Sequence, residues 1–324
     1  MNTITYNYKE FGVPSTEPEI KFDVYQNYFK CFRRFIEGKY GGKDQFVNFL
    51  WEKLVINKLS GSIDENIIKR FLYIGWNTEF LSSMNDNENI ELLKINNHWK
   101  PIQSYYAVYS VGEALGFLID KSTQESHSGC IKKLNTFLVE KIGVIEPWSF
   151  AYKGTLRHEF SPINFPIDVK LVNSLSRGGV RSVDMISTCL KAEHINMIED
   201  FKPQKTNKKQ KELGMAKKLK KDYDPGYTTI LDFLYRLRIK SNYKDVEIFI
   251  TDAPDDKIKG FSHNLSFVVS YTLTLFEIII IKRYGLNRFL KLAEDYCKNL
   301  GKQENDLSAR LKLYNNLKEV ATVA

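Results

Sequence analysis

The chain has few of the residues that hold metal ions or form disulfide frameworks. Its 324 residues include only five histidines and four cysteines, and no two cysteines are closely spaced. Such scattered cysteines are typical of neither a disulfide-rich secreted domain nor a zinc site. We therefore expect reduced thiols, a cytoplasmic location, and no metal or other cofactor.

Targeting and membrane signals are also sparse. The first seven residues, Met1 to Asn7, lack the basic and apolar regions of a secretory signal. The most apolar run, residues 265–281, is 17 residues long and contains serines, threonines and Glu277. A membrane-spanning helix needs about 20 mostly apolar residues, so this run predicts a buried bundle helix in a soluble protein without a membrane partner.

Common catalytic motifs are missing as well. The sequence has no GxxxxGK phosphate-binding loop and no GxSxG nucleophile elbow. Asp168 and Lys170 have the D-x-K form of a metal-dependent nuclease, with Glu146 or Glu159 as the further acidic residue. Because so short a pattern is common by chance, we favour an ordinary polar surface over a metal site.

Positive charge is concentrated in one segment. The net charge of the chain is +8, and residues 201–224 contain nine lysines and three acidic residues. The rest of the chain is therefore nearly neutral, and this segment predicts a mobile loop that attracts polyanions. A solvated loop without a ligand is the alternative. The lysines expected to contact nucleic acid are Lys208, Lys209, Lys217, Lys218, Lys220 and Lys221.

Apolar and aromatic residues recur at helical spacing along most of the chain, which predicts a mainly α fold. Residues 144–172, where prolines and aromatic residues alternate, are expected to be extended or irregular. We divide the chain into an N-terminal arm with helices (1–61), two parts of one bundle (62–142 and 227–324) and an insertion (143–226). Helices are expected at 22–39, 44–59, 64–81, 98–120, 129–141, 180–201, 228–250, 261–284, 288–300 and 306–320.

Two stretches resemble the HEPN superfamily, particularly the members that accompany minimal nucleotidyltransferases. The first contains Tyr105-Tyr106-Ala107, then Glu113-Ala114-Leu115, and a loop with His127 between two serines. The second is residues 237–245, where Arg238 precedes Asn242 and Tyr243. The resemblance implies an antiparallel helical bundle, and residues 143–226 would be an insertion between two of its helices.

The resemblance also implies a function. It indicates an RNA- or nucleotide-binding protein of a prokaryotic defence or toxin–antitoxin system, with a partner protein or a second copy of the chain. Active HEPN ribonucleases cut RNA without a metal, using an arginine and a histidine four to six residues later. Here the position five residues after Arg238 is Tyr243, and tyrosine, whose ordinary pKa is about 10, is a poor base at neutral pH.

The catalytic set implied by the resemblance is therefore Arg238, His127 and Tyr243. Arg238 would stabilise developing phosphate charge and His127 would transfer a proton across the cleft. Tyr243 could donate a hydrogen bond or stack on a base. Asn242, four residues after Arg238, would share its helical face and contact the same phosphate or base edge.

Structural roles remain open for each of these residues. Arg238 and Asn242 could pair internally or with Asp245, His127 could cap a helix, and Tyr105, Tyr106 and Tyr109 could be core residues. Three functions follow: RNA or nucleotide binding, a metal-independent endoribonuclease with a degenerate motif, or a structural helical subunit of a defence complex. Catalysis requires His127 near Arg238, whereas a structural subunit would have Arg238 and Asn242 buried and fully paired.

Overall fold

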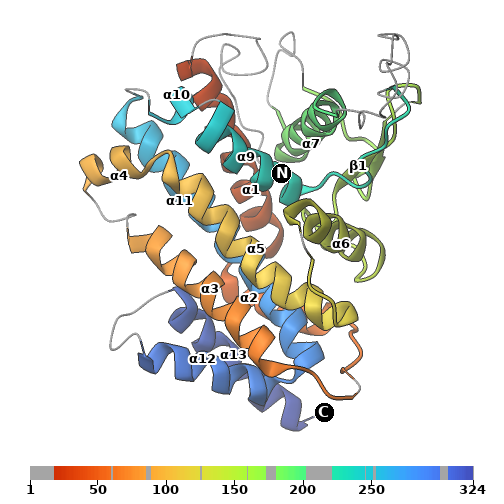
Figure 1. Ribbon diagram of the computed structural model, residues 1–324, viewed down its shortest axis with the longest axis vertical. Helices are drawn as coiled ribbons and strands as arrows, with labels where there is room; N and C mark the ends of the chain where they lie inside the picture. Colours follow the sequence, from red (N-terminus) through yellow and green to blue (C-terminus); the bar gives the residue numbers. More distant parts are fainter. Residues whose placement is uncertain are drawn as a thin grey trace, which may run out of the picture.

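The computed structural model describes residues 18–323, except 60, 85–88, 125, 159, 173–179, 202–220, 245, 251–252 and 300–305. Most of the described residues are helical, so the predicted mainly α fold is confirmed (Figure 1). The elements are α1 (Pro18–Tyr40), α2 (Lys43–Lys53), α3 (Glu65–Met84), α4 (Ile90–Asn96), α5 (Trp99–Asp120), α6 (His127–Glu140), β1 (Ala151–Lys153), β2 (Ser161–Ile163), α7 (Ser182–Glu199), α9 (Ile230–Ile239), a π-helical turn (Lys240–Lys244), α10 (Val246–Phe249), α11 (Asp255–Tyr284), α12 (Leu286–Asn299) and α13 (Asp306–Val323).

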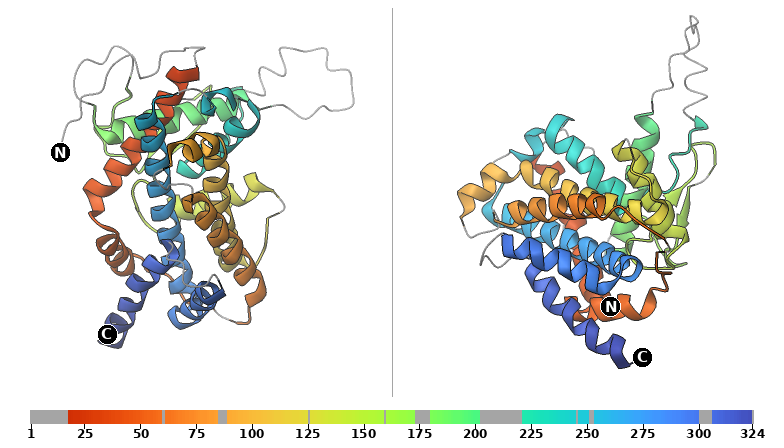
Figure 2. Two further views of the ribbon diagram at one scale, coloured as in Figure 1. Left: turned by 90° about the vertical axis from the view of Figure 1, so that its left-hand side faces the viewer. Right: turned by 60° about the horizontal axis from the view of Figure 1, so that its bottom comes forward.

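Helix α11 is the centre of the bundle. The left view of Figure 2 shows it between α1 on one side and α3 and α5 on the other. It is long and apolar enough to span a membrane, but 89% of its most apolar window is buried inside the fold. The prediction of a buried bundle helix at this position is therefore confirmed.

The first helix joins the same core through aromatic side chains. Tyr25, Phe29 and Phe32 of α1 surround Phe233 of α9, with ring centroids 5.1 to 6.3 Å apart. Their spacing of three and four residues is the periodicity that predicted this helix. One continuous hydrophobic core takes buried residues from all four segments into which we divided the sequence.

The four helices expected to pack together do so. Helix α5 contacts α6, α9 and α11, and α6 contacts α9. Helices α3 and α5 are antiparallel, since Lys100 at the start of α5 donates to the carbonyl of Ser82 near the end of α3. Helices α5 and α11 instead run in the same direction, because Arg283 at the end of α11 binds the carbonyls of Leu118 and Ile119 at the end of α5. This pair departs from the antiparallel arrangement that was expected.

The helices also differ from the sequence prediction in other respects, and α11 begins at Asp255 although it was expected to begin at residue 261. The expected helix 228–250 is interrupted after Ile239 by the π-helical turn, which separates α9 from α10. The second helix ends at Lys53 rather than Leu59. The short helix α4 was not expected, and Asn89 caps it by accepting hydrogen bonds from the backbone of Glu91 and Leu92.

The described part of the insertion is partly irregular, as predicted, and also contains helix α7 and two short strands. Strands β1 and β2 form an antiparallel pair in which Ala151 lies opposite Ile163. Tyr152 then exchanges two backbone hydrogen bonds with Thr228, just before α9. His194 is fully buried and bonds both Thr228 and the carbonyl of Gly154, so it has a structural role.

A buried ion network connects α3, α11 and α13. Arg310 has no exposed surface, and its guanidinium donates to both carboxylate oxygens of Glu79 at 2.6 and 2.8 Å. It also donates to both oxygens of Glu277 at 2.7 and 2.8 Å. Trp76 and Tyr314 complete the hydrogen bonding of Glu277. The single guanidinium of Arg310 is therefore shared by two carboxylates, and burial raises the pKa of Glu79.

Removing Arg310 should be among the most destabilising single changes in the chain. We expect Arg310→Ala to lower the free energy of unfolding by about 3–5 kcal/mol, because two buried carboxylates lose their counter-charge. Urea denaturation measures this loss. The control replaces all three charges together (Glu79→Leu, Glu277→Leu, Arg310→Met) and should recover much of the stability. Equal stability of Arg310→Ala and the wild type would contradict the prediction.

Candidate functional site

A hydrogen-bond network fixes the start of α9 against α6. Thr229 and Asp232 form a capping box, in which the backbone amide of Thr229 donates to Asp232 at 2.8 Å. Asn135 of α6 donates to Asp232 at 2.7 Å and accepts from the hydroxyl of Thr229 at 2.7 Å. Burial raises the pKa of Asp232 to about 7. The network sets the direction of α9, whose later residues Tyr235 and Arg238 then reach α5.

The start of α6 places His127 beside Tyr105 and Tyr109 of α5. Ser126 is the N-cap, and its side chain accepts a hydrogen bond from the backbone of Gly129 at 3.1 Å. His127 is therefore the first residue of the helix rather than part of the preceding loop. The cap is therefore Ser126 and not His127, for which a capping role was left open. It leaves the imidazole of His127 free to face α5.

Arg238 is enclosed by tyrosine rings. Its guanidinium carbon lies 5.2 Å from the ring centroid of Tyr105, 5.6 Å from Tyr106 and 5.1 Å from Tyr235. It donates one hydrogen bond, at 3.1 Å, to the hydroxyl of Tyr106. Its Nε is buried and has no hydrogen-bond partner among the described residues. We call Arg238, His127 and the tyrosines 105, 106, 109 and 235 the Arg238 cluster.

Some arginines of the bundle have carboxylate partners, whereas Arg283 binds the backbone carbonyls of α5. Arg236, two residues earlier on α9, binds Glu193 at 2.6 Å and Asp200 at 3.0 Å. Arg238 forms no ion pair with any residue that the structure describes, and Asp245, its expected internal partner, lies outside that part of the chain. Of these two arginines, only Arg236 has carboxylate partners among the described residues.

His127 contacts the same tyrosines. Its Nδ1 lies 2.9 Å from the hydroxyl of Tyr105, and its ring centroid lies 4.3 Å from that of Tyr109. Tyr105 is buried and its hydroxyl has no other described partner, so it donates to Nδ1 and the neutral imidazole carries its proton on Nε2. Burial and the nearby charge of Arg238 lower the pKa of His127, which makes the ring neutral at pH 7.

A buried carboxylate lies behind the tyrosines. Glu113 of α5 is 2% exposed, and Tyr109 and Cys130 hydrogen-bond to it. Its Oε1 has no partner among the described residues. The negative charge of Glu113 acts in the direction that raises the pKa of His127. Burial and Arg238 outweigh it, so the pKa is lowered overall. Burial raises the pKa of Cys130, so this thiol stays protonated and unreactive.

The structure brings His127 and Arg238 together but leaves Tyr243 outside. Tyr243 is 71% exposed, and no ring contact or hydrogen bond joins it to the described residues of the cluster. Asn242 is half-buried and no hydrogen bond links it to Arg238. The cause is the π-helical turn at 240–244, whose wider winding breaks the alignment of residues four apart.

The lysine-rich segment is attached next to α9. Five of its candidate lysines, at 208, 209, 217, 218 and 220, lie outside the described residues, and Lys221 is exposed. The rings of Phe201 and Tyr223, at the two ends of the segment, stack with centroids 3.9 Å apart. Asp200 beside Phe201 binds Arg236 and Lys244, on the same helix and turn as Arg238.

The D-x-K pattern does not form a metal site among the described residues. Asp168 binds Arg181 at 2.5 Å, and Glu146 is paired with Lys39 at the other side of the insertion. Glu159 lies outside the described residues. No group of three acidic, histidine or cysteine side chains able to hold a metal occurs in the part of the chain that is described. The preference for a polar surface therefore stands.

Two members of the site were missed by sequence reasoning. Tyr235 precedes Arg238 by three residues, so helical spacing places both on one face of α9 and could have indicated the contact. Glu113 belongs to an otherwise apolar stretch of α5, and a lone carboxylate there is itself a sign of a polar contact. The two best defined hollows among the described residues border Glu79 rather than Arg238.

No family model, curated protein or solved structure matches the chain. The geometry of the Arg238 cluster and the motifs around Tyr105 and Arg238 therefore provide the evidence on function.

The opposing effects of Arg238 and Glu113 on His127 can be measured separately. We expect the pKa of His127 to lie below the ordinary value of 6.5, to rise in Arg238→Gln and to fall further in Glu113→Gln. The reason is that each change removes one charge and keeps the shape of the side chain. Histidine resonances followed by NMR during a pH titration give these values, with His127→Gln for assignment. A pKa that moves in the same direction in both variants would refute the arrangement.

Proposed function

We propose that this HEPN-like chain binds RNA or a nucleotide at the Arg238 cluster and serves a prokaryotic defence or toxin-type system. The main evidence for a binding site is the environment of the Arg238 side chain. Its half-buried guanidinium has aromatic faces and one neutral hydroxyl around it, and no carboxylate among the described residues. The biological setting rests on the family resemblance alone.

The first argument is electrostatic. A guanidinium stays charged at any physiological pH, so it needs an anion, water or an aromatic face. Aromatic rings provide part of this stabilisation at Arg238, but its buried Nε has no hydrogen-bond partner among the described residues. A phosphate accepts two parallel hydrogen bonds from a guanidinium, which makes it a suitable ligand for an arginine that has no counter-ion among the described residues.

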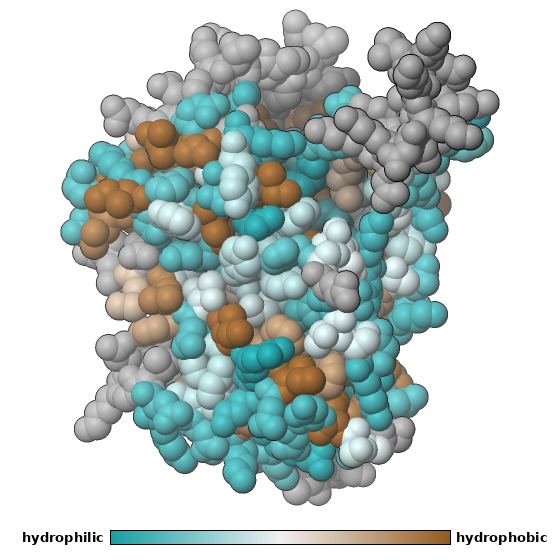
Figure 3. Space-filling model, viewed as in Figure 1, coloured by the Kyte–Doolittle hydropathy of each residue, from teal (hydrophilic) through white to brown (hydrophobic). Residues whose placement is uncertain are grey.

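The second argument concerns the aromatic residues. Tyr106, Tyr109, His127 and Tyr235 are each half-buried, so part of each ring remains accessible to solvent. Single-stranded nucleic acids bind by stacking bases on such rings beside basic side chains. In the view of Figure 3 the middle of this face, where α5, α6 and α9 meet, is pale or teal, and a polar ligand suits such a surface.

Metal-independent RNA cleavage is the second candidate function, and the position of His127 favours it. Its neutral imidazole lies against Tyr105, whose ring also contacts Arg238. A neutral imidazole is too weak an acid to protonate the leaving oxygen, so His127 would have to take up a proton first, which its lowered pKa disfavours at neutral pH. The third candidate, a purely structural subunit, requires a fully paired Arg238, and the unused Nε argues against it.

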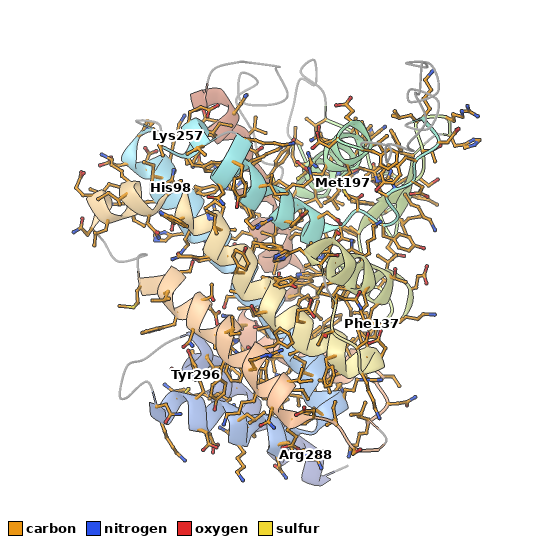
Figure 4. The ribbon with its side chains drawn as sticks, viewed as in Figure 1. His98, Phe137, Met197, Lys257, Arg288 and Tyr296 are labelled. Carbon is orange, nitrogen blue, oxygen red and sulfur yellow. The ribbon has the colours of Figure 1, made fainter. Side chains whose placement is uncertain are left out.

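Neutralising Arg238 should weaken binding without unfolding the chain. We expect Arg238→Gln to reduce affinity for a fluorescent single-stranded RNA by at least about tenfold, because one charge-assisted contact contributes roughly 1.5–3 kcal/mol. Fluorescence anisotropy measures the affinity. The matched control is Arg288→Gln on α12, which removes an equal charge at the bottom of the view, where α12 lies well below α9 (Figure 4). It should change affinity by no more than about threefold.

The outcomes separate the candidate functions. Loss of binding in a folded Arg238→Gln protein supports the site, and RNA cleavage abolished by His127→Gln would favour the nuclease. Wild-type affinity in Arg238→Gln would refute the site. Circular dichroism and thermal unfolding show whether each variant is folded.

The lysine-rich segment should add affinity that does not depend on sequence. Replacing Lys208, Lys209, Lys217, Lys218, Lys220 and Lys221 by glutamine should weaken RNA and DNA binding alike, because lysines contact phosphates rather than base edges. The slope of log affinity against log salt should fall by about 0.7 for each phosphate of a single strand that the variant no longer neutralises. Unchanged slopes would show that the segment is a solvated loop.

A further inference from the structure

The hydroxyl of Tyr105 determines which nitrogen of His127 carries the proton. Its oxygen lies 2.9 Å from Nδ1 of His127. Tyr105 is 2% exposed, and its hydroxyl has no other partner among the described residues. A buried O–H group without an acceptor is costly, so this hydroxyl donates to Nδ1. The neutral ring of His127 then carries its proton on Nε2, on the side away from Tyr105.

The rings that surround Arg238 also surround His127. The guanidinium carbon of Arg238 lies 5.1 to 5.6 Å from the ring centroids of Tyr105, Tyr106 and Tyr235. The imidazole centroid of His127 lies 5.6 to 6.3 Å from the same three centroids. Both side chains are half-buried, so each also reaches solvent. Arg238 and His127 therefore border the same part of the surface.

The polar groups that these side chains offer to a ligand are hydrogen-bond donors. A guanidinium has N–H groups and no acceptor, and Nε2 of His127 carries a hydrogen. The hydroxyl of Tyr106 already accepts from Arg238 at 3.1 Å, so its own hydrogen points elsewhere and has no acceptor among the described residues. Glu113 is the carboxylate of this region, and at 2% exposed it is out of a ligand's reach.

We propose that Tyr105 is a positioning residue that fixes His127 as a hydrogen-bond donor, and that the group bound at the Arg238 cluster is a phosphate rather than the edge of a base. This inference rests on the proposed function. Phosphate oxygens accept hydrogen bonds, so they match a set of donors. A base edge presents donors as well as acceptors, and its N–H groups would be left unpaired here. The base is then free to stack on an accessible ring such as Tyr109 or Tyr235.

Nitrogen NMR of the His127 ring tests the positioning role. At a pH where the ring is neutral, the shifts of its two nitrogens show which one carries the proton, and we expect Nε2. Tyr105→Phe keeps the aromatic ring and removes the hydroxyl, so it should allow the tautomer with the proton on Nδ1. The matched control is Tyr296→Phe on α12 (Figure 4), a buried tyrosine whose hydroxyl donates to Asn77 at 2.9 Å. It should leave the tautomer of His127 unchanged.

Competition against the fluorescent single-stranded RNA tests the ligand group. At constant ionic strength, adenosine should displace the RNA at least about tenfold less well than adenosine monophosphate, because it lacks the phosphate. Tyr105→Phe should weaken the binding of RNA and of adenosine monophosphate by roughly three- to tenfold, the effect of one neutral hydrogen bond. Tyr106→Phe should weaken both to a similar degree without changing the tautomer of His127. Tyr296→Phe should change neither affinity.

The outcomes keep this inference apart from the proposed function. A wild-type ring with its proton on Nδ1, a tautomer unchanged in Tyr105→Phe, or adenosine that competes as well as its monophosphate would each overturn the inference, while RNA binding that depends on Arg238 would stand. RNA binding that does not depend on Arg238 would contradict the proposed function instead. If Tyr105→Phe does not fold, the wild-type tautomer and the competition with Tyr106→Phe still decide the question.

Discussion

Glu277 is a charged residue at the most apolar point of the molecule. It lies fully buried in α11, and its carboxylate accepts hydrogen bonds from Trp76, Arg310 and Tyr314. A buried carboxylate without such partners would strongly favour unfolding or protonation. Because these partners come from α3 and α13, the requirement to satisfy one carboxylate aligns three helices. Helix α5 packs against two of them, α3 and α11, so the position of the Arg238 cluster depends on the same network.

The rule that a buried charge needs a partner also distinguishes the arginines of the bundle. Arg310 is fully buried and has two carboxylates, and Arg236 is largely buried and also has two. Arg238 is half-buried and its described neighbours are rings and a hydroxyl. A cation that is neither solvated on all sides nor neutralised has unused capacity for an anion. The π-helical turn directly after α9 is consistent with a site near Arg238, because such turns frequently interrupt helices at functional sites.

Much of the fold could be predicted because the relevant signals are local. The periodicity of apolar residues identified α1, α5 and α11. The resemblance placed His127 near Arg238, and both contact Tyr105 in the structure. Long-range contacts could not be found this way, since Arg310 and Glu79 are 231 residues apart.

Local geometry also limited the prediction of the site. Residues 240–244 have ordinary helical composition, so nothing in them indicated the π-helical turn that leaves Tyr243 exposed. Helix α4 has only seven residues, too few for a clear periodic signal. Glu113 gained its significance from the position of Tyr109 and Cys130 around it, which only the assembled bundle shows.

The stacked rings of Phe201 and Tyr223 have a consequence for how this protein can evolve. They hold the two ends of the lysine-rich segment together, and a salt bridge between Arg157 and Asp222 connects one end to the loop after β1. The entropic cost of closing a loop rises by only about 0.6 kcal/mol for each doubling of its length. Insertions, deletions and changes of charge within the segment therefore place little strain on the bundle. Selection can therefore change the length and charge of this segment while the helices that hold Arg238 stay unchanged.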